Sequence, residues 1–225
     1  MTSFPMRRSR RNAQSGFTLV EIAIVLVIIG LLLGGVLKGQ ELIENGRVKS
    51  AAADLNGISA AYNSYLDRYR KVPGDDGPVA TLTARGANWT GMAAGDANGV
   101  ILAPAAFTGV DEAGVFFRHL RAAGFITGDP AATLVAALPL NAWGGLTTVV
   151  NAPTIQGRPA TARLLVCMGN VPGKSASALD VQLDDGSPAL GAFRATVGGG
   201  NIAPGVAPTV PYSEDSTYTV CRDLG

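Results

Sequence analysis

The sequence predicts an α+β fold in which a long N-terminal helix packs on a small antiparallel β-sheet of a C-terminal domain. Three observations predict it. Residues 17–37 form an unbroken apolar run, and residues 38–71 continue with apolar side chains at helical spacing. Short β-like runs, separated by Gly- and Pro-rich segments, follow toward the C-terminus. The helix is therefore expected to have a membrane half and an amphipathic half.

The apolar run is long enough to span a membrane. As a helix, residues 17–37 would extend about 31 Å, against a hydrocarbon core of about 30 Å. The preceding residues 1–16 contain four arginines and no acid. Positive charge favours the cytoplasmic side, so the C-terminal body is expected on the other side. A secretory signal fits poorly, because the small residue Gly16 precedes the apolar run instead of following it.

Removing the charge of residues 1–16 leaves 14 basic and 17 acidic residues in the rest of the chain. Phosphate backbones are bound by basic faces, and this composition predicts none. Nucleic acid is therefore not evident as a partner from the charge, and a local basic patch is the alternative that stays open.

Glu21 is the one charge inside the apolar run. A carboxylate at the bilayer centre costs about 2.5–3.5 kcal/mol on insertion scales, and less near the interface. Cleavage between Gly16 and Phe17 would create an ammonium group about one helical turn away, which Glu21 of a neighbouring subunit would neutralise. The alternative is an incidental charge at the membrane interface.

Arginines, Gly16, the sequence Phe17-Thr18-Leu19-Val20-Glu21 and the apolar helix together resemble the N-terminal signal of type IV prepilins and type II secretion pseudopilins. The resemblance implies cleavage after Gly16 by a prepilin peptidase, N-methylation of Phe17 and a role for Glu21 in filament assembly. It also implies an inner-membrane protein with a periplasmic C-terminal domain. Its partners would be other pilin or pseudopilin subunits and an inner-membrane assembly platform, within a pilus or a periplasmic pseudopilus.

The match has one departure, since many pilins have a proline in this helix and the chain has none between Phe17 and Pro73. Gly30 and Gly34 form a G-x-x-x-G pair. Helix flexibility and close helix packing both remain open as its role.

The amphipathic continuation is expected to end at Val72-Pro73-Gly74. Its expected core stripe comprises Val48, Ala52, Leu55, Tyr62, Leu66 and Tyr69, widened by Ala51, Ile58 and Tyr65. The assignments divide the chain into a leader (1–16), a membrane or filament-core helix (17–37), its amphipathic continuation (38–72) and a periplasmic globular α+β pilin-like domain (73–225).

Residues 73–111 are predicted to form a long loop, in which Asp75-Asp76 marks a turn. Residues 95–101 resemble half of a calcium loop, but an Asx-type turn fits better because a distal bidentate glutamate is missing. A short helix is expected over 111–126, with Val115, Phe116, Leu120 and Ala123 toward the core. His119, the single histidine, is interpreted as a surface or structural side chain.

The C-terminal part is predicted to contain four strands and one further helix. Strands are expected at 146–150, 162–167, 192–197 and 217–221, and a helix at 175–185. Asp180, Asp184 and Asp185 are interpreted as a solvated acidic helix end, with calcium as the alternative. Neither a metal nor a cofactor is expected.

Cys167 and Cys221 are the only cysteines. An even count in an exported domain favours a disulfide, and two buried thiols are the alternative. The position of the pair is similar to the C-terminal disulfide loop of many pilins.

Three functions follow as hypotheses. The first is a structural filament subunit, which would be a pilin, a minor pilin or a pseudopilin. The second is a monomeric, membrane-anchored binding module that retains residues 1–16. The third is an anchored enzyme, and the sequence argues against it because it has one histidine, no G-x-S-x-G motif and no Walker A motif.

Overall fold

The structure, a computed structural model, describes residues 17–151, 154–158 and 164–224. Contacts divide the chain into two compact units, which comprise the residues up to Ile43 and those from Glu44 onward. The expected fold class is confirmed, because a long N-terminal helix is followed by a C-terminal four-stranded antiparallel sheet.

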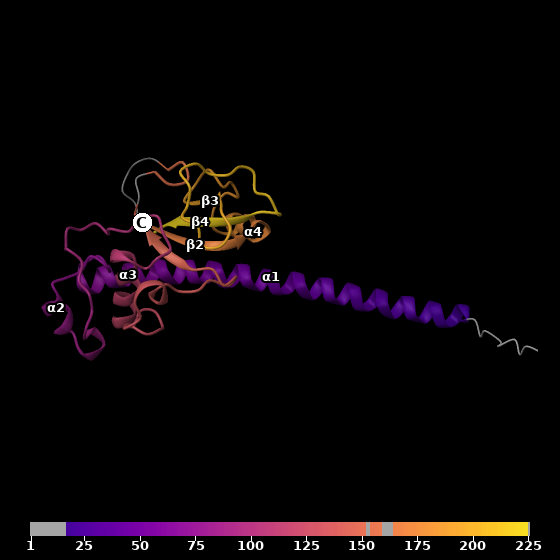
Figure 1. Ribbon diagram of the computed structural model, residues 1–225, viewed down its shortest axis with the longest axis horizontal. Coiled ribbons are helices and arrows are strands. Elements are labelled where there is room, and N and C mark those ends of the chain that lie inside the picture. The colour runs from indigo at the N-terminus through magenta and orange to yellow at the C-terminus, as the bar shows by residue number, and fades with distance from the viewer. Residues whose placement is uncertain (1–16, 152–153, 159–163, 225) are drawn as a thin grey trace, which may run out of the picture. The chain divides into compact units, whose positions relative to one another are not determined.

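Helix α1 spans Leu19–Tyr69 (Figure 1). In the second unit, one face of α1 is buried through Val48, Ala51, Ala52, Leu55, Ile58, Ala61 and Tyr65. Three side chains expected at the centre of the stripe, Tyr62, Leu66 and Tyr69, are only partly buried. The true stripe therefore turns toward Ile58, Ala61 and Tyr65, which the sequence prediction had placed at its margin or left out.

Residues 73–111 are more ordered than the predicted loop. They contain helix α2 (Val79–Thr83) and the 3-10 helix η1 (Ala87–Trp89). Leu82 and Trp89 are buried here. The prediction of a long loop missed these two short helices, because isolated apolar residues without any periodicity anchor the segment in the core.

Helix α3 (Asp111–Ala122) is shorter than expected, and the 3-10 helix η2 (Leu134–Ala137) follows it. Phe116 and Leu120 are buried as predicted, whereas Val115 and Ala123 are only partly buried. Phe117 is fully buried instead.

The sheet has the strand order β1-β2-β4-β3 and is antiparallel throughout. Its strands are β1 (Thr147–Val150), β2 (Leu165–Pro172), β3 (Phe193–Val197) and β4 (Thr217–Asp223), and helix α4 (Gly173–Leu183) follows β2 directly. The expected end of a strand at Cys167 was wrong. The strand continues through Gly169 and Asn170 to Pro172, with a register shift between Met168 and Val171. The first residues of that expected strand, 162 and 163, lie outside the described residues.

Cys167 and Cys221 face each other across the central strand pair and form a disulfide, with their Cα atoms 4.1 Å apart. Both cysteines are fully buried. The bridge therefore fixes the two middle strands of the sheet to each other inside the core.

Both edge strands are hydrogen-bonded to loops. Along β3, the Ala195 carbonyl accepts a bond from the Thr209 amide, and the Val197 amide donates to Thr209 Oγ1. At the start of β1, the Thr147 amide donates to the Pro139 carbonyl. Loops therefore take up backbone groups that edge strands otherwise present to other chains.

Candidate functional site

The N-terminal end of α1 is the region that the sequence singles out for chemistry. Gly16 lies outside the described residues. Phe17 is 84% exposed, and α1 begins two residues later at Leu19. The sequence-predicted residues Phe17 and Glu21 are thus both at the start of this helix.

Thr18 and Glu21 form a capping box. Glu21 Oε2 accepts hydrogen bonds from the Thr18 amide and the Thr18 hydroxyl, each at 2.8 Å, and the Glu21 amide donates to Thr18 Oγ1 at 3.3 Å. These reciprocal bonds satisfy donors that the first helical turn leaves without partners. The sequence analysis missed this role, although the T-x-x-E spacing is a recognisable signature of it.

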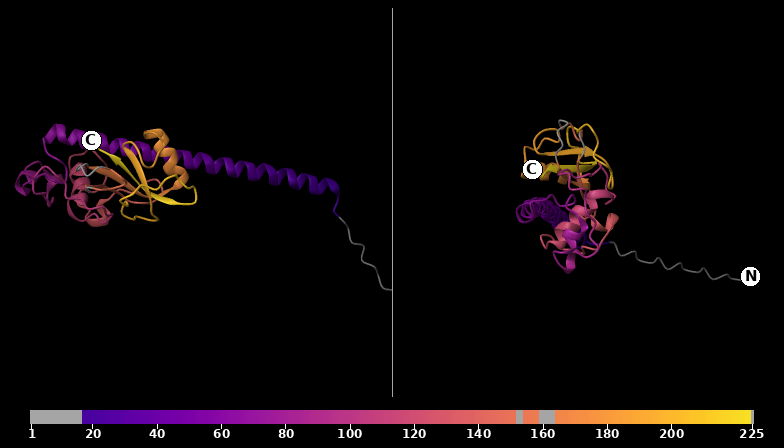
Figure 2. Two further views of the ribbon diagram at one scale, coloured as in Figure 1. Left: turned by 90° about the horizontal axis from the view of Figure 1, so that it is seen from above. Right: turned by 90° about the vertical axis from the view of Figure 1, so that its left-hand side faces the viewer.

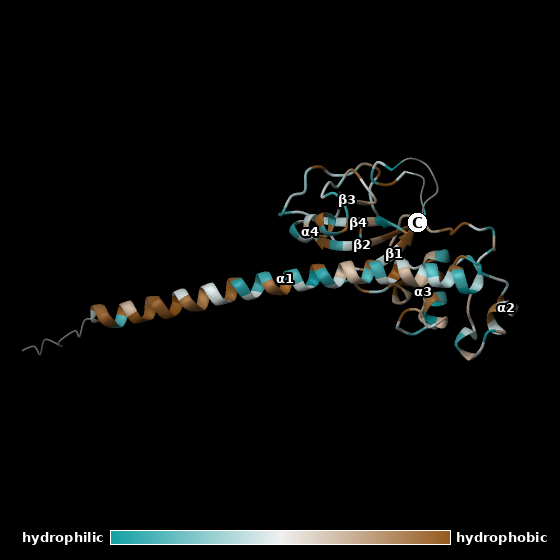
Figure 3. Cartoon of the chain, turned by 180° about the vertical axis from the view of Figure 1, so that it is seen from behind, coloured by the Kyte–Doolittle hydropathy of each residue, from teal (hydrophilic) through white to brown (hydrophobic). Residues whose placement is uncertain are grey.

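The first unit presents an apolar surface. None of its described side chains is buried, and Figure 3 shows the corresponding part of α1 as predominantly hydrophobic. Helix α1 is long and apolar enough to cross a membrane. At Gly30 and Gly34, no atom of another part of the described chain lies within 4 Å of the place where a Cβ would be, so the structure leaves this pair open to a partner helix.

At the beginning of the second unit, Glu44 connects α1 to two distant segments. Its Oε1 accepts a hydrogen bond from Trp143 Nε1 at 2.6 Å and another from the Ser175 hydroxyl at the start of α4. Arg47 lies 3.4 Å from the other carboxylate oxygen. Burial raises the pKa of Glu44, but the bonds from Ser175 and Trp143 and the charge of Arg47 outweigh it, so the pKa is lowered overall.

At the other end of α1, Asp76 is the centre of a buried polar network. Its Oδ2 accepts bonds from the Tyr65 hydroxyl and from Arg85 Nη1, both at 2.7 Å. Its Oδ1 has no hydrogen-bond partner within the described residues. Asp75 and Asp76 are both buried, so the sequence interpretation of a simple turn was incomplete.

His119 is a structural residue in this region. Its Nδ1 accepts a bond from the Gly74 amide, which leaves the proton on Nε2 to face the Ala93 carbonyl at 2.9 Å. The imidazole is fully buried, and burial lowers its pKa to about 4. Neutral His119 therefore holds in place the chain segment that follows α1.

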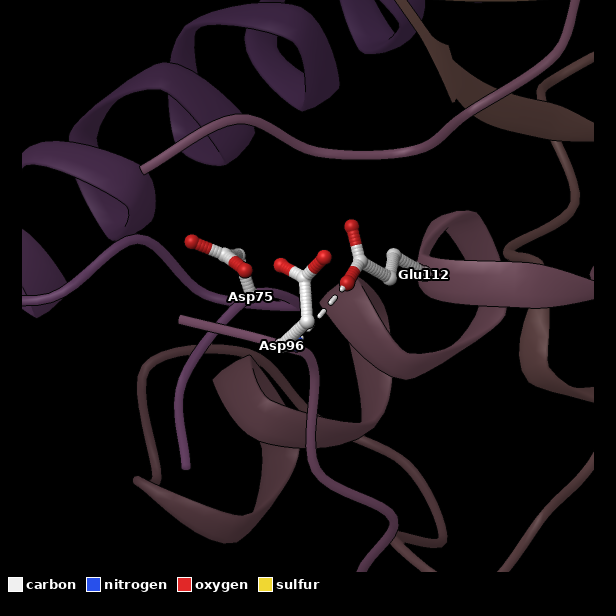
Figure 4. Close-up of side chains that lie close together, drawn as sticks. All are labelled: Asp75, Asp96 and Glu112. Carbon is white, nitrogen blue, oxygen red and sulfur yellow. Dashed lines mark hydrogen bonds between the residues drawn. The ribbon is translucent and has the colours of Figure 1, made fainter. Parts of the chain in front are cut away.

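Three carboxylates gather beside this network. Asp75, Asp96 and Glu112 each offer an oxygen within 4.8 Å of the others, as Figure 4 shows. Backbone amides already donate hydrogen bonds to these carboxylates. Asp75 accepts bonds from the Asn98 and Gly99 amides, and Glu112 accepts one from the Leu102 amide. Burial and the neighbouring carboxylates raise the pKa of Glu112.

The same loop contains the expected Asx-type turn, in which Asp96 Oδ1 accepts a bond from the Asn98 amide at 3.2 Å. Calcium prefers oxygen ligands, and a group of three carboxylates supplies them. Asp75, Asp96 and Glu112 are thus the residues that would bind such an ion, and the sequence analysis did not bring them together because they come from three separate segments.

The second acidic group, at the end of α4, is only partly solvated. Asp184 and Asp185 are exposed as expected, but Asp180 is fully buried. Its carboxylate accepts bonds from the Tyr212 hydroxyl and the Gly186 amide. Asp180 was therefore wrongly interpreted as solvated, because its partner Tyr212 is 32 residues away.

The chain has similarities to known proteins. Residues 11–37 match the family model described as the prokaryotic N-terminal methylation motif. The chain is 32% identical over 104 residues to the fimbrial protein EcpC of Eikenella corrodens, an alignment that covers 44% of this chain and 68% of that protein. Among solved structures, the major type IV pilin PilA1 from Clostridium difficile matches with 13% identity and a TM-score of 0.40, covering 81% of this chain and 97% of that one.

An apolar helix with a capped start, followed by a disulfide-linked sheet domain, is the arrangement of a pilin-like structural subunit. With the matched motif and the fimbrial relative, the chain belongs to the type IV prepilin family.

Proposed function

We propose that the chain is matured by cleavage between Gly16 and Phe17 and by N-methylation of Phe17, and that it is then assembled into a filament. The observation that carries this proposal is the match of residues 11–37 to the methylation motif. A prepilin peptidase of the inner membrane would perform both steps. The capped, exposed start of α1 supports the proposal, because it leaves Phe17 outside the helix.

In the proposed cycle, residues 17–37 first span the inner membrane, and residues 73–225 fold in the periplasm. An assembly platform then moves the subunit into the filament, where the apolar part of α1 packs against other subunits. Glu21 would neutralise the Phe17 ammonium of a neighbouring copy in the dry core. Because the curated relative is a fimbrial protein, a pilus is favoured over a secretion pseudopilus.

Maturation is tested by the intact mass of the membrane-purified protein, for the wild type and for Gly16→Ala. We expect the wild type to begin at N-methylated Phe17 and the variant to retain residues 1–16. A wild-type chain that retains residues 1–16 in a host with an active prepilin peptidase would refute the proposal and favour a simple membrane-anchored module.

The role of Glu21 is tested separately with two substitutions. Glu21→Gln keeps an acceptor for the capping box but removes the charge, whereas Glu21→Ala removes both. If Glu21 neutralises an ammonium group, both variants should be matured and both should be lost from sheared filaments. Normal assembly of Glu21→Gln would show that Glu21 serves only as a cap.

A further inference from the structure

A small polar cavity lies at the C-terminal end of α1, inside the second unit. Its volume is about 250 Å³, and Arg68, Arg85, Asn88 and Trp89 are among the side chains that line it. This is below the volume of about 300–1,000 Å³ that is typical of small-molecule pockets. The cavity therefore suits a single functional group of a partner better than a whole metabolite.

Arg85 is held rigidly at this cavity. Its Nη1 donates to buried Asp76, at 2.7 Å, and to the Tyr65 hydroxyl, at 3.1 Å. Its guanidinium carbon lies 4.2 Å from the ring centre of Tyr69 and 4.9 Å from that of Trp89. A side chain fixed in this way loses little conformational entropy when it binds a ligand.

The remaining donors at the cavity are unused. Within the described residues, Arg85 Nε and Nη2 donate to no acceptor, because both of its hydrogen bonds come from Nη1. Arg68 is exposed, and its guanidinium carbon lies 5.3 Å from the ring centre of Tyr69. Two guanidinium groups with free N–H donors at one cavity match the oxygen atoms of a carboxylate.

The chain itself has two neighbouring carboxylates that are exposed and so accessible to such a cavity on another molecule. Glu214 and Asp215 are consecutive and exposed, and they make no hydrogen bond or ion pair within the described part of the chain. They occupy a turn that is anchored to the start of α4, because the Gly173 amide donates to the Ser216 carbonyl. The turn thus presents two negative charges from a fixed base.

The cavity and the turn lie at opposite ends of the second unit. Ser175, two residues after the anchor of the turn, bonds to Glu44 at the beginning of the unit. Arg68 is 24 residues further along α1, which corresponds to roughly 36 Å at the helical rise. Figures 1 and 2 agree, since α2 and α4 lie at opposite ends of this unit.

We propose that the cavity of one copy binds the Glu214–Asp215 turn of a second copy, a contact that rests on the proposed filament function. Two different surfaces meet in such a contact, so it repeats from copy to copy. In a filament, where the repeat does not close into a ring, it generates an open, helical assembly. A nucleic-acid phosphate would satisfy the same donors, but the acidic body of the chain disfavours it.

The experiment is a charge exchange in the full-length chain, produced in cells that assemble its filaments. Arg68→Glu and Asp215→Arg should each lower the amount of chain in sheared filaments about tenfold, and the double variant should restore it. Arg68 is chosen because it is exposed, whereas loss of Arg85 would leave Asp76 buried without its counter-ion. Asp129→Arg, an exposed charge on another loop, is the control and should assemble normally.

Cysteine cross-linking tests the contact directly. Arg68→Cys combined with Asp215→Cys should give disulfide-linked multimers in intact filaments, whereas Arg68→Cys combined with Asp129→Cys should not. Filaments that contain the chain but yield no Arg68–Asp215 cross-link would overturn this contact and leave the proposed function standing. If the mature chain enters no filament at all, the proposed contact and the proposed filament function both fail.

A third outcome assigns the cavity to a different ligand. Arg68→Glu filaments that assemble normally but no longer retain a single-stranded oligonucleotide would show that the cavity binds phosphate, and would overturn the contact between copies.

Discussion

Two glutamates on the same helix differ in where their partners come from. Glu21, in the first unit, is bonded by Thr18, three residues away. Glu44, in the second unit, is bonded by Trp143 and Ser175, which are 99 and 131 residues away. One carboxylate is satisfied by its own helical turn, and the other by the tertiary fold.

The same difference extends to the apolar side chains. The second unit buries its part of α1 against its own chain, while the described side chains of the first unit remain unburied. A stretch of this hydrophobicity is stable only where lipid or other subunits cover it. The second unit is therefore expected to hold its structure by itself, and the first only in a membrane or an assembly. Both tryptophans, Trp89 and Trp143, lie in the second unit, so tryptophan fluorescence reports on that unit alone.

The largest effect is expected from the disulfide. Replacing Cys167 and Cys221 by alanine should lower the free energy of unfolding of the second unit by about 4 kcal/mol, because the bridge closes a loop with a sequence separation of 54. The measurement is denaturant unfolding in detergent, followed by tryptophan fluorescence. Reduction of the wild type is the control and should give the same shift. An unchanged midpoint would mean that the sheet does not depend on the bridge.

Acid should destabilise the second unit through His119. Its pKa in the folded state, about 4, lies below the ordinary value of 6.5, so neutral histidine is favoured by folding. The stabilisation is complete above pH 6.5 and is lost as the pH falls toward 4, by about 3 kcal/mol in total.

Unfolding measured between pH 7 and pH 5 tests this, because the chain has one histidine and carboxylates titrate mostly lower. His119→Gln retains polar groups but does not titrate in this range, so its stability should change less over the same interval. Equal slopes for the two proteins would contradict the assignment.

A smaller effect is expected from Glu44→Ala. The substitution leaves the Trp143 and Ser175 donors without their acceptor and should cost about 2 kcal/mol of the stability of the second unit. Glu41→Ala, in the first unit and paired with Lys38 at the surface, is the matched control and should change that stability little. If the two variants behave alike, Glu44 does not join α1 to the sheet domain.

The smallest effect is expected from Thr18→Ala, which removes the cap of α1. Amide hydrogens of the first turn should exchange about fivefold faster, while the fluorescence-detected unfolding midpoint stays unchanged. Hydrogen exchange of the detergent-solubilised protein measures the first quantity. A shift of the midpoint would show that the two units are coupled more strongly than their separate contacts indicate.

Much of the fold could be predicted because it depends on local patterns. The uninterrupted apolar run and the Pro-Gly stop define α1 almost to the residue. The strand positions follow from short β-branched runs, with errors confined to their ends. The second strand was expected to end at Cys167, but pairing with β4 carries the backbone on to Pro172 through an irregularity.

The buried polar groups could not be predicted, since their partners lie on other elements that only the tertiary fold brings to them. Nothing near Asp76 in the sequence shows that Tyr65 and Arg85 will surround it, and nothing near His119 indicates the Gly74 amide. The capping box of Thr18 and Glu21 is different. Its T-x-x-E signature is local, so the sequence alone is enough to predict it.

The loops that cover the sheet edges have a consequence for a crowded assembly. In a filament, the C-terminal domains of many copies would be held side by side at very high local concentration, where open edge strands readily pair between chains. Because Thr209 bonds to both Ala195 and Val197, the outer edge of β3 has fewer free groups with which to recruit a strand from a neighbour. Covered edges of this kind would keep the sheets of adjacent copies separate in such an assembly.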